Sequence, residues 1–172
     1  MKSNTQKTTF WYQLKEYGYK NFFLSFDFVI SIVILLFLII DKILGTGIFL
    51  TGTNELTIGI IATASTLFAI TLASLAIIFS FSSSSFVSFL KEKGKLSSIL
   101  FLFWSGNISY LITIVISFMY LILGSHFSLL KDSLYILIIP IFLYSLINTF
   151  YLLATVIRFG HFLDLYDSKT ND

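Results

Sequence analysis

Four long segments of the chain are almost entirely apolar, and they constrain its fold more than any other feature. They extend over residues 22–44, 56–90, 97–124 and 133–163. Crossing the hydrocarbon core of a bilayer, about 30 Å thick, takes about 20 helical residues, so each segment is long enough. The strands of a membrane barrel would alternate apolar and polar residues, whereas residues 32–40 are apolar without a break. The sequence therefore predicts an all-α integral membrane protein with four transmembrane helices.

The composition excludes most other classes of protein. Charged residues make up 12% of the chain and hydrophobic residues 56%, whereas a soluble domain has roughly 25% charged residues. Such a chain has too little polar surface to fold as a soluble enzyme or a nucleic-acid-binding domain. The absence of cysteine rules out thiol catalysis and cysteine metal sites. We therefore expect no enzyme, catalytic residue, metal or cofactor, and no direct contact with nucleic acid.

The distribution of basic residues predicts the orientation of the chain. Eight of the 11 Lys and Arg residues fall before the first segment, between the second and third, or after the fourth, and a ninth, Arg158, lies near the C-terminal end of the fourth. Basic residues concentrate on the cytoplasmic side of membrane proteins. The prediction is that both termini lie in the cytoplasm, with residues 1–21 as an interfacial arm on the inner leaflet, 22–163 as the transmembrane domain and 164–172 as a cytoplasmic tail.

The second segment carries a stripe of small side chains at steps of three and four residues. Small residues let another helix approach closely, and in lipid such packing replaces the missing hydrophobic drive. Two interpretations follow, namely packing inside one protomer or a seam between the subunits of a homo-oligomer. The stripe consists of Gly59, Ala62, Thr66, Ala69, Ala73, Ala76 and Ser80.

The third and fourth segments each carry a polar face with the same helical spacing. Polar side chains avoid lipid tails, so these faces are expected to turn toward protein or water. Hydrogen bonding between the two helices is one interpretation, and the wall of a wetted cavity or pore is the other. The candidates are Asn107, Tyr110, Thr113 and Ser117 on the third segment, and Tyr144, Asn148, Tyr151 and Thr155 on the fourth.

Two ionisable residues lie at matching depth near the cytoplasmic ends of the first and fourth segments. These are Asp27 and Arg158. An unpaired charge at membrane depth is costly, and an arginine forms a favourable fork with a carboxylate. We therefore predict a charge pair. In the alternative, Arg158 reaches the lipid headgroups and Asp27 is hydrated.

The stretch 67–81, followed by a run of serines and a lysine-rich turn, resembles the second helix of small four-span prokaryotic membrane proteins. Some of those proteins belong to anti-phage defence loci, such as the membrane subunit of the Kiwa system. The resemblance implies a homo-oligomeric inner-membrane component that works with a cytosolic protein partner. The turn itself offers a cytoplasmic docking surface made of Lys91, Glu92, Lys93 and Lys95.

Two functions remain open from the sequence. In the first, the protein is a sensor or scaffold that recruits a cytosolic partner to the membrane, in phage defence if the resemblance holds. In the second, it is an oligomeric channel or membrane-perturbing effector whose polar faces line the path. A ring of charge or a filter motif usually marks an ion path, and its absence here favours the scaffold. A cation transporter would need an acidic residue at mid-depth, and Asp27 is too shallow for that role.

Overall fold

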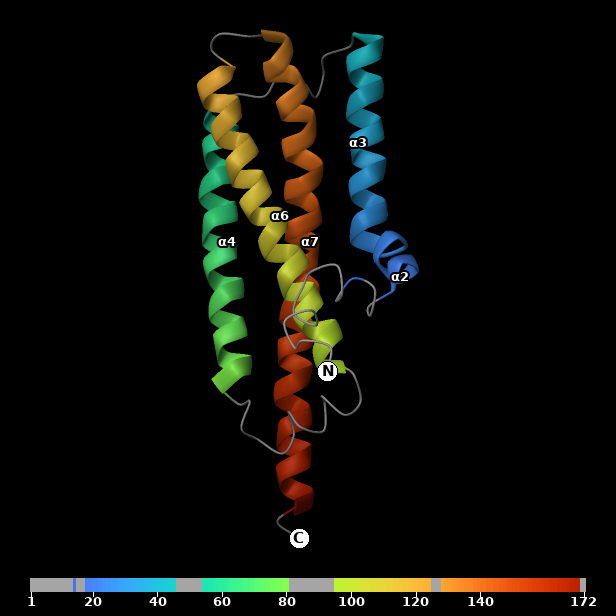
Figure 1. Cartoon of the computed structure of the whole chain (residues 1–172), viewed down its shortest axis with the longest axis vertical. Coiled ribbons are helices and arrows are strands. Elements are labelled where there is room, and N and C mark those ends of the chain that lie inside the picture. Colours follow the sequence, from blue (N-terminus) through green and yellow to red (C-terminus); the bar gives the residue numbers. More distant parts are fainter. Residues whose placement is uncertain (1–13, 15–17, 46–53, 81–94, 125–127, 171–172) are drawn as a thin grey trace, which may run out of the picture.

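The structure is a computed structural model that describes residues 14, 18–45, 54–80, 95–124 and 128–170. This part of the chain is helical, which confirms the predicted all-α class (Figure 1). Its helices are α2 (Tyr19–Phe23), α3 (Phe26–Leu44), α4 (Asn54–Ser80), α6 (Lys95–Leu123) and α7 (Ser128–Thr170).

Three of these helices are long and apolar enough to cross a membrane. The apolar spans are Asn54–Ile77 in α4, Ile99–Leu123 in α6 and Leu130–Arg158 in α7. The remaining predicted span, which is the first along the chain, corresponds to α3. This helix has 19 residues and a length of about 28 Å. It differs from the other three because charged residues lie near both of its ends, at Asp27, Asp41 and Lys42.

The first predicted helix is interrupted where the sequence analysis placed a continuous segment. It divides into α2 and α3, and the chain leaves helical geometry at Ser25, whose backbone is extended. Aromatic packing fixes this break. The Phe22 ring makes edge contacts with Phe101 of α6 and Tyr144 of α7, at centroid distances of 5.8 and 6.4 Å. Phe22 is therefore a side chain that anchors the turn to the bundle.

The other helix boundaries differ from the predictions in two places. Helix α4 is described as far as Ser80, and the predicted extension over residues 81–90 lies outside the described residues. Helix α7 continues beyond residue 163 to Thr170, so it includes most of the predicted tail. The only proline of the chain is Pro140, and no later proline stops the helix. With 43 residues, α7 is about 65 Å long.

Helices α4, α6 and α7 pack together, and α3 lies against the outer side of α7 (Figure 1). One apolar cluster joins the three packed helices near the α6–α7 connection, through Ile60, Tyr120, Tyr135 and Ile138. A second cluster, around Phe103 and Leu152, joins α6 to α7 nearer the start of α6. The tightest part of the molecule is therefore the α6–α7 pair, which carries most of the predicted polar residues.

Candidate functional site

Hydroxyl groups buried between α6 and α7 form a closed network. The Tyr110 hydroxyl lies 2.5 Å from Thr149 Oγ1, and each of these hydroxyls lies 3.0 Å from the carbonyl oxygen of Ser145. Each hydroxyl carries one hydrogen, so one donates to the other and the second donates to the carbonyl. All three residues are buried. This network links the two helices without any need for water.

One turn further toward the start of α6, Asn148 packs directly on Gly106. The side chain of Asn148 is 0% exposed, and its Nδ2 donates to the carbonyl oxygen of Leu102 at 3.1 Å. A Cβ atom added at Gly106 would lie 2.5 Å from that Nδ2. The missing side chain of Gly106 is thus what lets the amide reach α6.

Most of the predicted polar candidates are enclosed by the chain itself. Asn107 bridges to α4, because Thr71 Oγ1 donates to its Oδ1 at 2.6 Å. Thr155 is half-buried and Tyr151 is exposed. The other five are buried, and two of them, Tyr144 and Asn148, also line the cavity described below; the five are Tyr110, Thr113, Ser117, Tyr144 and Asn148.

The predicted charge-pair residues lie in different environments. Asp27 is 6% exposed, whereas Arg158 is exposed at the end of the α7 span. Within the described part of the chain, no ion pair joins them. Asp27 instead lies in the first turn of α3, where the helix dipole favours a negative charge.

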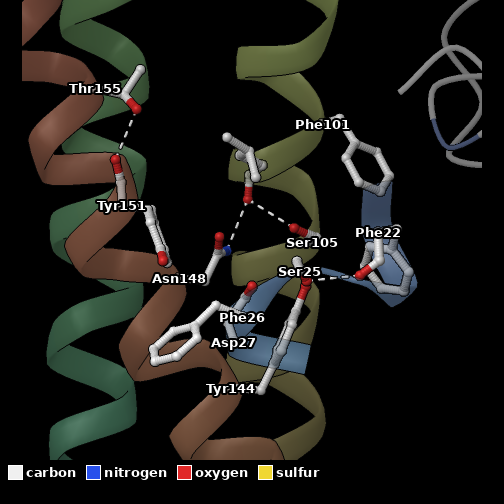
Figure 2. A pocket seen from close by; sticks show the side chains of 11 residues that line it. Phe22, Ser25, Phe26, Asp27, Phe101, Ser105, Tyr144, Asn148, Tyr151 and Thr155 are labelled. Carbon is white, nitrogen blue, oxygen red and sulfur yellow. Dashed lines mark hydrogen bonds between the residues drawn. The ribbon is translucent and has the colours of Figure 1, made fainter. Parts of the chain in front are cut away.

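A cavity of about 290 Å³ lies between the α2–α3 turn, α6 and α7. Figure 2 shows the residues that line it, with Phe22 and Asp27 from the turn, Ser105 from α6, and Asn148 and Tyr151 from α7. The sequence analysis found Asn148 and Tyr151 through helical spacing, and Asp27 through its charge at membrane depth. It missed Phe22 and Ser105, since their position depends on the break between α2 and α3.

The small-residue stripe of α4 points away from the rest of the chain. All seven of its members are exposed. Helix α4 uses a different face, which includes Thr57, Ile60, Ala64 and Thr71, for its buried positions. Two hydroxyls of the stripe are satisfied within the helix, because Thr66 Oγ1 donates to the Ala62 carbonyl and Ser80 Oγ to the Ile77 carbonyl. The stripe therefore offers a flat surface with no unsatisfied hydroxyl at those two positions.

The predicted cytoplasmic docking surface lies almost entirely outside the described residues. Lys91, Glu92 and Lys93 fall in the segment 81–94, and Lys95 is the first residue of α6. Among the residues that the structure describes, no group of three His, Cys, Asp or Glu side chains is placed to hold a metal ion. The geometry thus offers three features: a sealed helix pair, a cavity beside it and an exposed stripe.

Comparison with known protein families, curated proteins and solved structures gives no match to this chain.

Proposed function

We propose that the chain is a non-enzymatic, four-span component of a prokaryotic inner membrane that assembles with copies of itself and recruits a cytosolic protein partner. The exposed stripe of α4 carries this proposal. Close packing of helices in lipid requires small side chains whose polar groups already have hydrogen-bond partners. Because the stripe does not pack inside the chain, a second copy is its natural partner.

Helix α3 supplies the fourth span in this proposal. Its length of about 28 Å is close to the thickness of the hydrocarbon core. Its two acidic residues do not face lipid, since Asp27 and Asp41 are each 6% exposed. Lys42 at the far end donates from Nζ to the Ser133 hydroxyl of α7 at 3.2 Å. The charged residues that set α3 apart are therefore at its ends or turned toward protein.

The burial of the polar faces favours a scaffold over a channel. A channel built on these faces needs Tyr110, Thr113, Ser117 and Asn148 to meet water, and each is fully buried in one chain. A role in phage defence has its support in the resemblance of residues 67–81. The cytosolic partner would dock on the lysine-rich bend at Lys91, Glu92, Lys93 and Lys95.

Disulfide crosslinking tests the seam directly, because the chain contains no cysteine of its own. We expect single-cysteine variants Ala69→Cys and Ala73→Cys to form covalent dimers when membranes are oxidised, and to do so at low expression. Val115→Cys on α6, which is 57% exposed and sits on a face without small residues, is the matched control and should remain monomeric. Equal crosslinking from all three variants, or none from the two α4 variants, would overturn the seam.

Accessibility labelling tests the orientation. Cysteines placed at Lys93 and Lys169 should both react with a membrane-impermeant maleimide only after the inner membrane is opened, because basic segments stay on the cytoplasmic side. A cysteine at Lys131, one of the two basic residues outside the cytoplasmic set, should react in intact spheroplasts. If Lys93 and Lys169 are labelled from opposite sides, the shared docking surface does not exist.

A further inference from the structure

The cavity beside the α2–α3 turn contains two oxygen-bearing groups for which the described part of the chain provides no donor. The Asp27 carboxylate lines the cavity at 6% exposure, and no described residue gives it a hydrogen bond or an ion pair. Asn148 also lines the cavity, and its Oδ1 is buried without a hydrogen-bond partner. A buried acceptor without a hydrogen bond lowers the stability of the fold by about 1–3 kcal/mol, and by more if the group is charged. A donor that enters the cavity would remove that cost.

Three of the hydroxyls that line the cavity already donate within the chain. Ser25 Oγ donates to the Phe22 carbonyl at 2.7 Å, and Ser105 Oγ donates to the Leu102 carbonyl at 3.0 Å. Thr155 Oγ1 donates to the Tyr151 carbonyl at 2.8 Å. Since a hydroxyl has one hydrogen, these three groups present only oxygen lone pairs to the cavity (Figure 2). The polar lining therefore combines three committed hydroxyls and the Asp27 and Asn148 acceptors with the phenol hydroxyls of Tyr144 and Tyr151.

The remaining wall is aromatic. Phe22, Phe26, Phe101 and Tyr144 all line the cavity, and aromatic faces attract organic cations, most strongly where water is excluded. A hard metal ion would instead need six or more oxygen ligands. A carboxylate, an amide oxygen and several rings are better suited to an ammonium group. The cavity volume of about 290 Å³ also exceeds by far what a single water needs.

A second, apolar crevice of about 460 Å³ adjoins the cavity and shares Phe22 and Tyr144 with it. Its lining continues along α3 past Ile32 to Leu35, and along α6 to Ile112. The charged end thus lies at the start of α3, and the apolar end lies deeper along the same helix. This order matches an amphiphile that is held in one leaflet of a bilayer.

We propose that the cavity binds the ammonium head of an amphiphilic organic cation, with the Asp27 carboxylate and Asn148 Oδ1 as acceptors and the hydrocarbon chain in the adjoining crevice. The proposal is independent of self-assembly through α4. An amine-bearing lipid and a free alkylammonium compound share this chemistry, and the experiment below distinguishes between them.

Equilibrium dialysis of radiolabelled octylammonium, whose head carries three N–H donors, against phosphatidylglycerol nanodiscs, with empty discs subtracted, measures the binding. We expect saturable binding to the wild-type chain, and no binding of octanesulfonate. Asp27→Asn should weaken the affinity at least tenfold, whereas Asp132→Asn, in the first turns of α7 and outside the cavity, should stay within twofold. Equal affinity of Asp27→Asn and wild type, or saturable binding of octanesulfonate, would overturn the proposal.

Two further variants keep the test decisive if Asp27→Asn does not fold. Phe26→Leu removes a lining ring that is 64% exposed, and should weaken binding about threefold. Ile112→Trp should fill the crevice, so that octylammonium binds no better than butylammonium. Wild-type affinity in both variants would show that the probe binds elsewhere. Competition by added phosphatidylethanolamine would assign the site to a lipid amine, and its absence would assign it to a free cation.

Discussion

Gly106→Leu is expected to lower the free energy of unfolding by about 3 kcal/mol, because overpacking a filled interior costs about 1–3 kcal/mol and sometimes more. The Cβ alone would meet Asn148 Nδ2 at 2.5 Å, and the Asn148 side chain is fully buried. To make room, it must give up its bond to the Leu102 carbonyl. The measurement is the unfolding of the purified protein in mixed micelles, followed by circular dichroism as SDS is added.

Alanine substitutions at two glycines provide the matched control. Alanine in place of a helical glycine normally stabilises by about 0.5–1 kcal/mol. We expect this gain at Gly59, where an added Cβ meets nothing within 4 Å, and a net loss at Gly106. The loss at Gly106 should shrink when Asn148→Ser has already shortened the opposing side chain. If both alanine variants gain stability equally, the contact between Gly106 and Asn148 is wrong.

Tyr110→Ala is expected to cost about 3–5 kcal/mol of unfolding free energy, the usual range for removing a fully buried aromatic side chain. Tyr110 is 0% exposed and holds α7 through both Thr149 and the Ser145 carbonyl. The same unfolding assay measures the change. Tyr110→Phe separates the hydroxyl from the ring, and should cost about 0.6–1.7 kcal/mol, the measured span for hydrogen bonds between membrane helices.

A double-mutant cycle checks the assignment of the hydroxyl network. Tyr110→Phe and Thr149→Val should not add, since both remove the same hydrogen bond. Tyr151→Phe is the control, because it removes the hydroxyl of an exposed tyrosine on α7, the helix that carries Thr149. It should change the free energy of unfolding by less than about 0.5 kcal/mol. Strict additivity of the first pair would mean that the two hydroxyls do not interact in the folded protein.

The helical class and three of the spans could be predicted from the sequence because hydropathy acts locally. Each of α4, α6 and α7 is apolar over enough consecutive residues to be recognised as a membrane span from that run alone. The spacing of Tyr110 and Asn148 likewise predicts that their sides avoid lipid, and both side chains are buried. Spacing alone does not say whether such a face meets protein or water, since that depends on which neighbour fills it.

The break at Ser25 and the cavity behind it could not be predicted in this way. Residues 22–28 contain Ser25 and Asp27 among apolar side chains, and these two polar residues alone do not predict a break. The Phe22 and Phe28 rings contact Phe101 and Tyr144, which are far away in the chain. The orientation of α4 could not be predicted either. Its stripe of small residues and its buried face, which includes Thr57, Ile60, Ala64 and Thr71, both follow helical spacing. Which of them packs on α6 is decided by the hydrogen bond between Thr71 and Asn107.

The position of α3 has a consequence for how the protein is made. Helix α3 packs on α7, and Lys42 reaches Ser133, 91 residues later in the chain. A ribosome completes α3 first and α7 last, so α3 must wait in the nascent protein until the final helix emerges. During that interval the backbone N–H and C=O groups of α3 are hydrogen-bonded within the helix. The side chains of Asp27 and Asp41 are not yet covered by the helices that bury them in the folded chain. A chain truncated before α7 would therefore lack the helix against which α3 packs.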